Sequence, residues 1–222
     1  MEYEIDVARC HVCLYGPDTE SSLPVIWLPC QRSQGKNVFA LLRKQCILFC
    51  LSDMDWNDDL SPWPAPRLFS ASADFGGQAP AFLSLFTQNI LPAAESMLPF
   101  PATQRGIAGY SMAGLFALYA LYHTALFTAA ASVSGSLWFD GWAEYASSHS
   151  FAVSFPYLYL SLGRKEHRVR NVRMAQIKHC TQALANAWQI PLILHPGGHF
   201  HNPELRLAQG IDALVSHYNS IQ

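Results

Sequence analysis

The sequence predicts an α/β fold in which a mostly parallel β-sheet is covered by helices on both faces. Two observations predict it: short apolar runs of strand length alternate with segments of helical spacing, and charge is scarce. Of 222 residues, 50% are hydrophobic and only 14% are charged, against about a quarter charged in a typical domain. Continuous apolar runs are typical of strands buried on both faces. The composition also excludes an intrinsically disordered chain, which would be polar and highly charged.

The expected elements alternate along the chain. Strands are expected at residues 9–15, 24–29, 46–51, 105–109, 129–134, 157–162 and 191–194. Helices are expected at residues 36–44, 79–97 (broken at Pro92), 114–123, 173–187 and 202–218. Residues 52–66 contain three closely spaced prolines and are expected to lack regular structure, as is the loop that carries Trp138 and Trp142. No repeat or linker interrupts this order, so a single domain spanning residues 1–222 is expected.

Several features argue against other classes of protein. The net charge of −2 gives no basic surface for nucleic acid. Residues 1–8 carry three acidic side chains, unlike a secretory signal. Residues 113–133 lack formal charge and have nearly the length of a membrane span, but His123 and two threonines favour a buried helix followed by a core strand. We therefore expect a cytoplasmic protein with no membrane or nucleic-acid partner, and self-association to a homo-oligomer stays open.

The six cysteines fall mostly in apolar runs, which is typical of reduced, buried cysteines in a cytosolic protein. Cys10-x-x-Cys13 has the spacing of a redox pair or of half a metal site, but no second half follows at ligand spacing. The histidines at residues 195–201 likewise have no carboxylate or cysteine at a useful spacing. The sequence therefore predicts neither a metal nor a cofactor.

A serine lies in a short turn between a predicted strand and a predicted helix. Residues 109–114 read GYSMAG, which approximates the G-x-S-x-G nucleophile elbow around Ser111. The turn is so sharp that only very small side chains fit two positions before and after the serine; Gly109 fits fully and Ala113 adds one methyl group. The alternative is an ordinary glycine- and serine-rich helix start. The place of the turn, between the fourth and fifth predicted strands, favours a nucleophile.

A nucleophilic serine needs a histidine base. In this architecture the serine, the acid and the histidine follow one another in that order along the chain, and the histidine comes after the last strand. Residues 195–201 (HPGGHFH) lie there. His199 is favoured because the two glycines before it let the backbone turn toward Ser111, and His201 and His195 are the alternatives.

The acid that orients the histidine is expected after the preceding strand. Glu166 is the first carboxylate there and would accept the second ring N–H of the base. Asp140 is the rival, and a Ser–His dyad without an acid is also open. Six basic residues surround Glu166 along the chain and would hold it ionised; they favour either an anionic substrate or, preferably, a solvated surface: Arg164, Lys165, Arg168, Arg170, Arg173 and Lys178.

The remaining parts of the expected site are an oxyanion hole and a pocket. The backbone N–H of Met112, at the helix N-terminus, is one expected donor. The second is the N–H of Cys30 or Gln31, after the strand at residues 24–29. Trp138, Phe139 and Trp142 follow the strand after the elbow helix and either wall a substrate pocket or pack a loop onto the domain.

Several longer motifs occur together: GYSMAG, SPWPAP followed by FGGQAPAFLSLF, SGSLWF, SLGRKEHRVRN and HPGGHFHNPELRLAQG. Together they resemble the esterase-D and enterochelin-esterase-like branch of the α/β-hydrolase superfamily, most closely its small esterases without a lid. The resemblance implies a three-layer α/β-hydrolase fold, Ser111 as nucleophile and His199 as base. Glu166 lies at a position that is usually acidic in that family, whereas Arg164 stands where relatives often carry an aspartate.

Motifs and resemblance together predict a serine carboxylic-ester hydrolase that acts on a small soluble ester through an acyl-enzyme. A thioesterase or acyltransferase would use the same groups, and so would a siderophore or lactone esterase or a peptidase, because specificity lies in loops. A non-catalytic binding protein on the hydrolase fold is the alternative of a different class.

Overall fold

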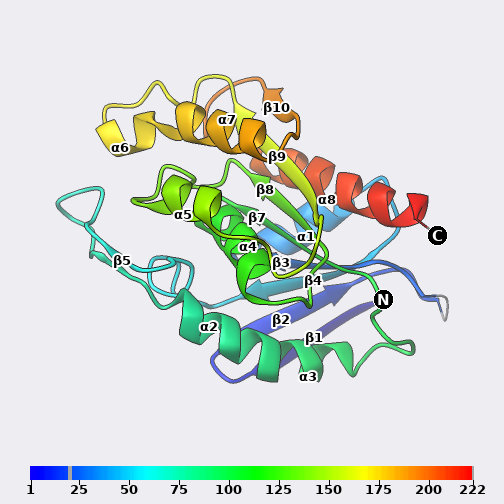
Figure 1. The fold of residues 1–222 in the computed structure, drawn as a ribbon. Helices are drawn as coiled ribbons and strands as arrows, with labels where there is room; N and C mark the ends of the chain where they lie inside the picture. The colour runs from blue at the N-terminus through cyan, green and yellow to red at the C-terminus, as the bar shows by residue number, and fades with distance from the viewer. Residues whose placement is uncertain (20–21, 222) are drawn as a thin grey trace.

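The computed structural model describes residues 1–19 and 22–221, and an eight-stranded sheet lies at its centre (Figure 1). The strand order is β1-β2-β4-β3-β7-β8-β9-β10. β2 runs antiparallel to both of its neighbours, and every other neighbouring pair is parallel. The sheet strands are β1 (Glu2–Val7), β2 (Cys10–Tyr15), β3 (Val25–Pro29), β4 (Ile47–Ser52), β7 (Arg105–Tyr110), β8 (Ala129–Val133), β9 (Tyr157–Gly163) and β10 (Leu192–His195).

Apolar composition decides which strands are central. β3 (VIWLP), β4 (ILFCLS) and β8 (AAASV) are buried along their whole length, as strands with helices on both faces must be. The two edge strands are more exposed. β1 was not expected from the sequence, because EYEIDV carries three acidic residues; as an edge strand it keeps these side chains in solvent.

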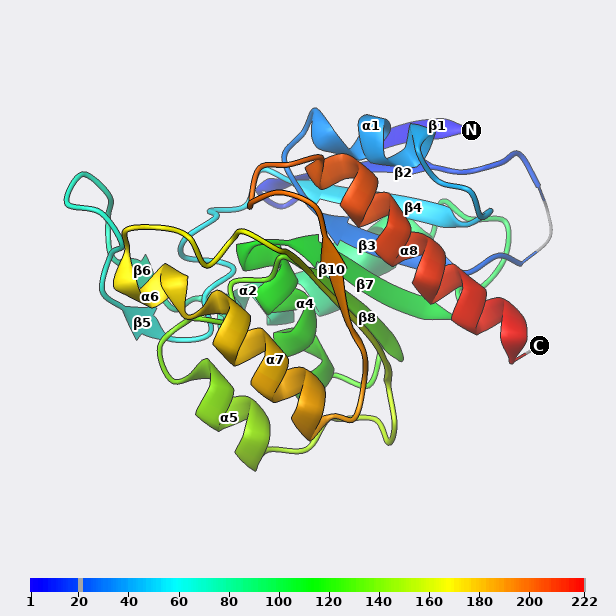
Figure 2. The same ribbon diagram turned by 90° about the horizontal axis from the view of Figure 1, so that it is seen from above.

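Helices cover both faces of this sheet (Figures 1 and 2). α1 (Gln34–Ala40) and α8 (Pro203–Ser220) pack on one face. The other face carries α2 (Ala79–Leu85), α3 (Leu91–Glu95), α4 (Met112–His123), α5 (Trp142–Ser148) and α7 (Ile177–Ala187), with the short α6 (Val172–Ala175) before α7. This three-layer arrangement confirms the predicted fold class.

The uncharged segment at residues 113–133 forms most of α4 together with β8, as predicted. α4 is buried from Met112 to Tyr122 and packs against β7 and β8. Within residues 1–19 and 22–221, none of the helices combines the length and the apolar character that crossing a bilayer requires.

Four local predictions differ from the structure. The helix at residues 79–97 is not ended by Pro92: one π-helical turn, η1 (Phe86–Ile90), lies directly before α3, whose first turn contains the proline. The helix expected at residues 173–187 is divided into α6 and α7. α5 was not expected at all, and the proline-rich segment contributes β5 (Pro64–Ala65), which pairs with β6 (Phe75–Gly76).

The cysteine prediction is confirmed: all six are free, and five are buried. Cys10 and Cys13 are three positions apart on β2, so their side chains lie on opposite faces of the sheet. They cannot act as a redox pair in this fold.

Candidate active site

Ser111 lies at a strained turn between β7 and α4. Its backbone angles are φ 59° and ψ −123°, a conformation that L-residues rarely adopt. A side chain at Gly109 would be impossible, because its Cβ would lie 2.1 Å from the carbonyl oxygen of Ala113. The strand–turn–helix context and the requirement for a small residue are those of a nucleophile elbow.

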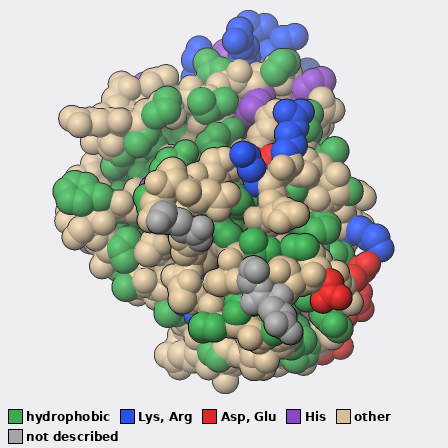
Figure 3. All heavy atoms as spheres, turned by 90° about the vertical axis from the view of Figure 1, so that its right-hand side faces the viewer, with side chains coloured by type: hydrophobic (Ala, Val, Ile, Leu, Met, Phe, Trp, Pro, Cys, Tyr) green, Lys and Arg blue, Asp and Glu red, His purple; other side chains and the backbone are tan. Residues whose placement is uncertain are grey.

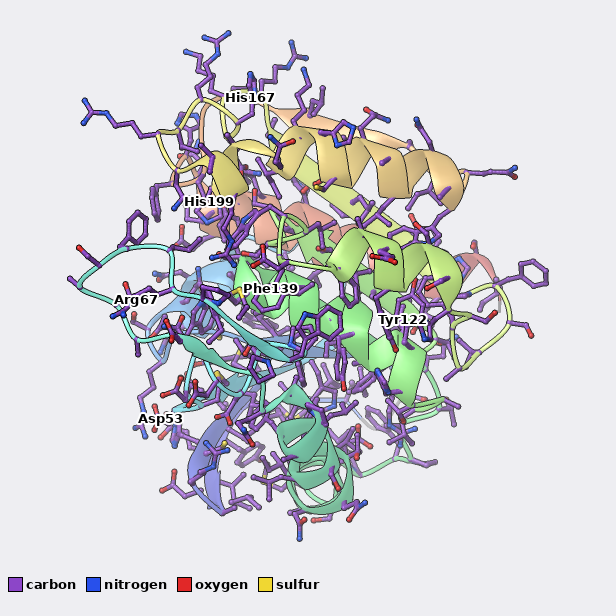
Figure 4. All side chains as sticks on the ribbon, turned by 60° about the vertical axis from the view of Figure 1, so that its left-hand side comes forward. Asp53, Arg67, Tyr122, Phe139, His167 and His199 are labelled. Atoms are coloured by element: carbon purple, nitrogen blue, oxygen red, sulfur yellow. The ribbon has the colours of Figure 1, made fainter. Side chains whose placement is uncertain are left out.

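The parallel sheet brings the predicted site residues to one edge. Ser111 follows β7, Glu166 follows β9 and His199 follows β10, and the carboxyl ends of parallel strands meet at the same edge of a sheet. All three residues line one cavity of about 250 Å³. Figure 4 places His199 between the loop that carries Arg67 and the helices α6 and α7, with Phe139 toward the interior.

His199 and Glu166 are joined directly. Nδ1 of His199 donates a hydrogen bond of 2.9 Å to Oε2 of Glu166, whose side chain is 2% exposed. The rival acid, Asp140, is exposed and forms an ion pair with Arg173 at 2.9 Å instead. Of the two alternative histidines, His195 ends β10 and His201 is exposed, and neither lines the cavity.

A positive φ at Gly197 shapes the loop that carries the histidine. Gly197 has φ +81°, and a Cβ there would lie 2.5 Å from the side chain of His201. The loop is tied to the acid loop because the backbone N–H of Lys165 donates to the carbonyl oxygen of Gly197 at 2.9 Å. The loops of the base and the acid are therefore held together by main-chain contacts.

The cation that pairs with Glu166 is not among the residues predicted from the sequence. Arg206, on α8, is buried, and its Nη2 donates to Oε1 of Glu166 at 2.9 Å. The same oxygen accepts from Ser134 Oγ at 2.5 Å and from the Gly163 N–H at 2.6 Å. Burial alone would raise the pKa of Glu166, but hydrogen bonds from His199, Ser134 and Arg206 lower it to about 2. The carboxylate is therefore ionised at neutral pH.

The expected source of that stabilisation was different. The sequence suggested the basic residues near Glu166 in the chain, but Arg164 and Lys165 are exposed, and the cation that contacts the carboxylate comes from α8. Figure 3 shows lysine and arginine side chains gathered at the top of the molecule, the end at which Figure 1 places α6 and α7. A signal for Arg206 existed: Gly210, Leu214 and Tyr218 follow at intervals of four on the buried face of α8.

Arg206 also links the acid to the base. Its Nη1 donates to Tyr110 Oη at 3.1 Å, and the Tyr110 hydroxyl donates to the carbonyl oxygen of His199. Tyr110 directly precedes Ser111. Arg206 and Tyr110 therefore connect β7 and its following residue Ser111 with the loop that carries His199.

Ser111 Oγ shares a hydrogen bond of 3.4 Å with Ser136 Oγ, and none with His199 is recorded among the described residues. Ser136 holds the turn from the other side as well, since its N–H donates to the carbonyl oxygen of Ser111 at 2.9 Å. Bonds between nucleophile and base are often long in sites without substrate and tighten when it binds. In this structure Ser111 Oγ therefore pairs with a second hydroxyl that also lines the cavity.

The three predicted oxyanion donors lie in different surroundings. Met112 lines the cavity in the first turn of α4, where backbone N–H groups have no acceptor within the helix. The prediction for Cys30 is wrong, because its N–H donates to the carbonyl oxygen of Leu51 at 2.9 Å. Gln31 is exposed and does not line the cavity.

The aromatic prediction also holds only in part. Trp138 lines the cavity, but Phe139 and Trp142 are 2% and 0% exposed and do not line it. Both pack against Trp63, with ring centroids 6.1 and 6.4 Å apart, and so anchor α5 and its loop. Apolar walls that the sequence did not predict come from other loops: Trp56, Leu68, Phe75, Val169, Met174, Ile177 and Phe200.

Residues 41–196 match the model of the family described as "Putative esterase". The chain belongs to this family. Over 114 residues the chain is 32% identical to the uncharacterized protein YbbA of Bacillus subtilis, a match that covers 50% of the chain and 46% of YbbA. The matched region thus spans about half the length of that curated relative.

Two solved structures share the fold of the esterase. An IroE-like serine hydrolase from Shewanella oneidensis has a TM-score of 0.81 at 17% identity, covering 98% of this chain and 81% of the other. The siderophore hydrolase EstA from Aspergillus nidulans has a TM-score of 0.75 at 17% identity, covering 98% and 94%. These similarities confirm the α/β-hydrolase-like fold predicted from the sequence.

Proposed function

We propose that this esterase hydrolyses small carboxylic esters through an acyl-enzyme, with Ser111 as nucleophile, His199 as general base and Glu166 as the orienting acid. The observation that carries the proposal is the hydrogen bond from His199 Nδ1 to the buried Glu166, in the cavity that Ser111 also lines. Ser111 attacks the ester carbonyl as His199 Nε2 takes its proton. The same histidine then protonates the leaving alcohol and activates the water that releases the acid.

Glu166 supports the chemistry without exchanging a proton. By accepting the Nδ1–H it selects the tautomer in which Nε2 carries a lone pair, and its charge stabilises the imidazolium that forms. Its pKa of about 2 keeps it ionised while His199 changes charge. The Glu166 carboxylate accepts hydrogen bonds from four residues, so its orientation is set before substrate binds: Arg206, Ser134, Gly163 and His199.

The oxyanion hole of the proposal combines two segments. Met112 N–H supplies one donor at the positive end of α4. The candidate for the second donor is the N–H of Trp56, which follows β4 and lines the cavity, in the role expected for Cys30 or Gln31; the N–H of the neighbouring Asn57 already donates to Oδ1 of Asp55 at 3.0 Å. The developing oxyanion would then lie between the elbow and this loop.

The substrate proposal follows from the size and chemistry of the cavity. About 250 Å³ with mostly apolar walls suits a short acyl group or a small aromatic one. EstA, of the same fold, is named a siderophore hydrolase, and an ester of that kind is a candidate here. The cytoplasmic location remains a prediction, supported by six free cysteines.

Covalent labelling tests the nucleophile. A fluorophosphonate probe is expected to modify Ser111, because an activated serine attacks phosphorus as it attacks an ester carbonyl. Peptide mass spectrometry locates the label, and a panel of p-nitrophenyl esters, lactones and thioesters then defines the substrate class. Modification of another serine, or none in a folded sample that hydrolyses esters, contradicts the assignment.

The acid can be tested with a matched pair of variants. Glu166→Gln is expected to lower kcat by about 10⁴-fold, because an amide donor favours the wrong histidine tautomer. Asp140→Asn, which removes the rival carboxylate, is expected to change kcat less than threefold, since Asp140 pairs with Arg173. Steady-state kinetics on one p-nitrophenyl ester compares the two. Equal losses in both variants, or a larger loss in Asp140→Asn, rule out Glu166 as the acid.

A further inference from the structure

The β1–β2 hairpin places four chemically reactive side chains on one face of the sheet. In its register Glu4 is opposite Cys13, and Asp6 is opposite His11. Residues two apart on a strand share a face, as do residues directly opposite across strands. None of the four lines the cavity at Ser111.

Three of these side chains direct donor atoms at one point. His11 Nε2 lies 3.2 Å from Cys13 Sγ and 3.8 Å from Glu4 Oε2, and Cys13 Sγ lies 3.7 Å from Glu4 Oε1. A tetrahedral ion with Zn–N about 2.0 Å and Zn–S about 2.3 Å separates its ligand atoms by roughly 3.4–3.6 Å. The donor atoms are thus already spaced like members of one coordination sphere.

Asp6 contacts the other ring nitrogen of His11. Its Oδ1 accepts a hydrogen bond of 2.7 Å from Nδ1 of His11, which leaves the Nε2 lone pair facing Cys13 and Glu4. Carboxylates orient metal-binding histidines in this way. The His11 side chain is 7% exposed and Glu4 is 61% exposed, so the point is enclosed by protein on one side and open to solvent on the other.

We propose that Glu4, His11 and Cys13 bind one divalent ion of the zinc class, with Asp6 as the positioning residue and water in the fourth position. The thiol proton of Cys13 passes to solvent as the S–metal bond forms, so thiolate and carboxylate together balance the two charges of the ion. Thiolate and imidazole ligands select Zn²⁺ over Mg²⁺ or Ca²⁺. The ion links the edge strand β1 to β2, and this role is independent of the proposed esterase activity.

The sequence around Cys10-x-x-Cys13 predicted no metal site because the expected ligands were sought only at nearby positions along the chain. The hairpin supplies them from across two strands, and Cys10 lies on the opposite face. The cation next to this cluster, Arg32, is held by Asp53 at 2.5 Å. Figure 4 shows Asp53 beside the hairpin, so Arg32 has a carboxylate partner of its own.

Cobalt binding tests the proposal. The purified full-length protein, freed of metal by a chelator, is titrated with Co²⁺ alone and followed by absorption. One equivalent is expected to bind and produce a thiolate-to-cobalt charge-transfer band, which Zn²⁺ then removes by displacing the cobalt. Cys13→Ala is expected to lose the band, whereas Cys10→Ala, a thiol three residues away on the opposite face, is expected to keep it.

Two further variants test the ligand Glu4 and the positioning residue Asp6 without disturbing the core. Glu4→Gln, at an exposed position, is expected to weaken Zn²⁺ binding at least tenfold in competition titrations. Asp6→Asn is expected to weaken it about 10–100-fold, the usual effect of losing such a carboxylate. Circular dichroism checks that each variant is folded. Absence of the band from the folded wild type, its survival in Cys13→Ala, or its loss in folded Cys10→Ala overturns the proposal.

Discussion

Ser111→Ala is expected to lower kcat for p-nitrophenyl acetate by on the order of 10⁶-fold, the size of loss seen when the nucleophile of a serine hydrolase is removed. The acyl-enzyme cannot form without the hydroxyl, and the oxyanion donors and the cavity supply only the residual rate. Steady-state and burst kinetics measure the loss. The melting temperature is expected to stay within about 2 °C of wild type, because the side chain shares one long hydrogen bond, with Ser136.

Ser136→Ala is the matched control for this experiment. Ser136 Oγ lies 3.4 Å from Ser111 Oγ and lines the same cavity, so both variants remove a hydroxyl from one place. Ser136→Ala is expected to retain activity within about tenfold, since the hydroxyl it removes is not the attacking group. A Ser111→Ala variant within tenfold of wild type, or losses of equal size in the two variants, is incompatible with Ser111 as nucleophile.

Arg206→Met is expected to reduce the free energy of unfolding by about 3–5 kcal/mol, the range for removing one partner of a buried ion pair. Arg206 and Glu166 are each 2% exposed at the side chain, so the carboxylate would keep its charge without water or a cation to compensate it. The melting temperature is expected to fall by roughly 10 °C for a chain of this length. Thermal and urea unfolding at pH 7 measure the change.

The pH dependence gives this prediction a second readout. The folded-state pKa of Glu166 is lowered to about 2 from an ordinary value of 4.5, so its contribution to stability is fully present above pH 4.5 and is lost as pH falls toward 2. Without Arg206 the folded-state pKa of Glu166 is expected to rise, so the variant loses less stability than wild type when the pH is lowered. The difference in stability between wild type and Arg206→Met is therefore expected to be largest above pH 4.5 and to narrow below it.

Arg105→Met serves as the control for removing an arginine from an ion pair. Arg105 pairs with Glu95 at 2.8 Å, but its side chain is 24% exposed and reaches water. We expect a loss less than half as large as that of Arg206→Met, with ester hydrolysis unchanged. If Arg206→Met unfolds within about 1 kcal/mol of wild type at pH 7, the buried pair does not hold the acid as described.

Ser111, Glu166 and His199 could be placed from the sequence because each follows a recognisable apolar strand, and parallel strands bring such positions to one edge. Arg206 could not be placed in the same way. Arg206 contacts Glu166, which lies 40 residues earlier in the chain, and Tyr110, which lies 96 residues earlier. Both contacts depend on how α8 lies across the sheet. Local spacing carries no information on that angle.

Two other errors have local causes. Trp142 is expected in a loop, either as a pocket wall or as packing onto the domain, but it begins α5 and is fully buried there, in contact with Trp63. Cys30 was expected to have a free N–H after β3, yet the pairing of β3 with β4 extends one residue further and uses it. The end of a strand depends on its pairing with a neighbouring strand, and the sequence of the strand alone does not show that pairing.

The hydroxyl of Tyr110 has a mechanical consequence for catalysis. Because Tyr110, which precedes Ser111, donates a hydrogen bond to the main chain of His199, movements of the Ser111 turn and of the His199 loop are coupled. Thermal motion of the surrounding loops is therefore expected to alter how ligands enter and leave more than it alters the backbone separation between Ser111 and His199.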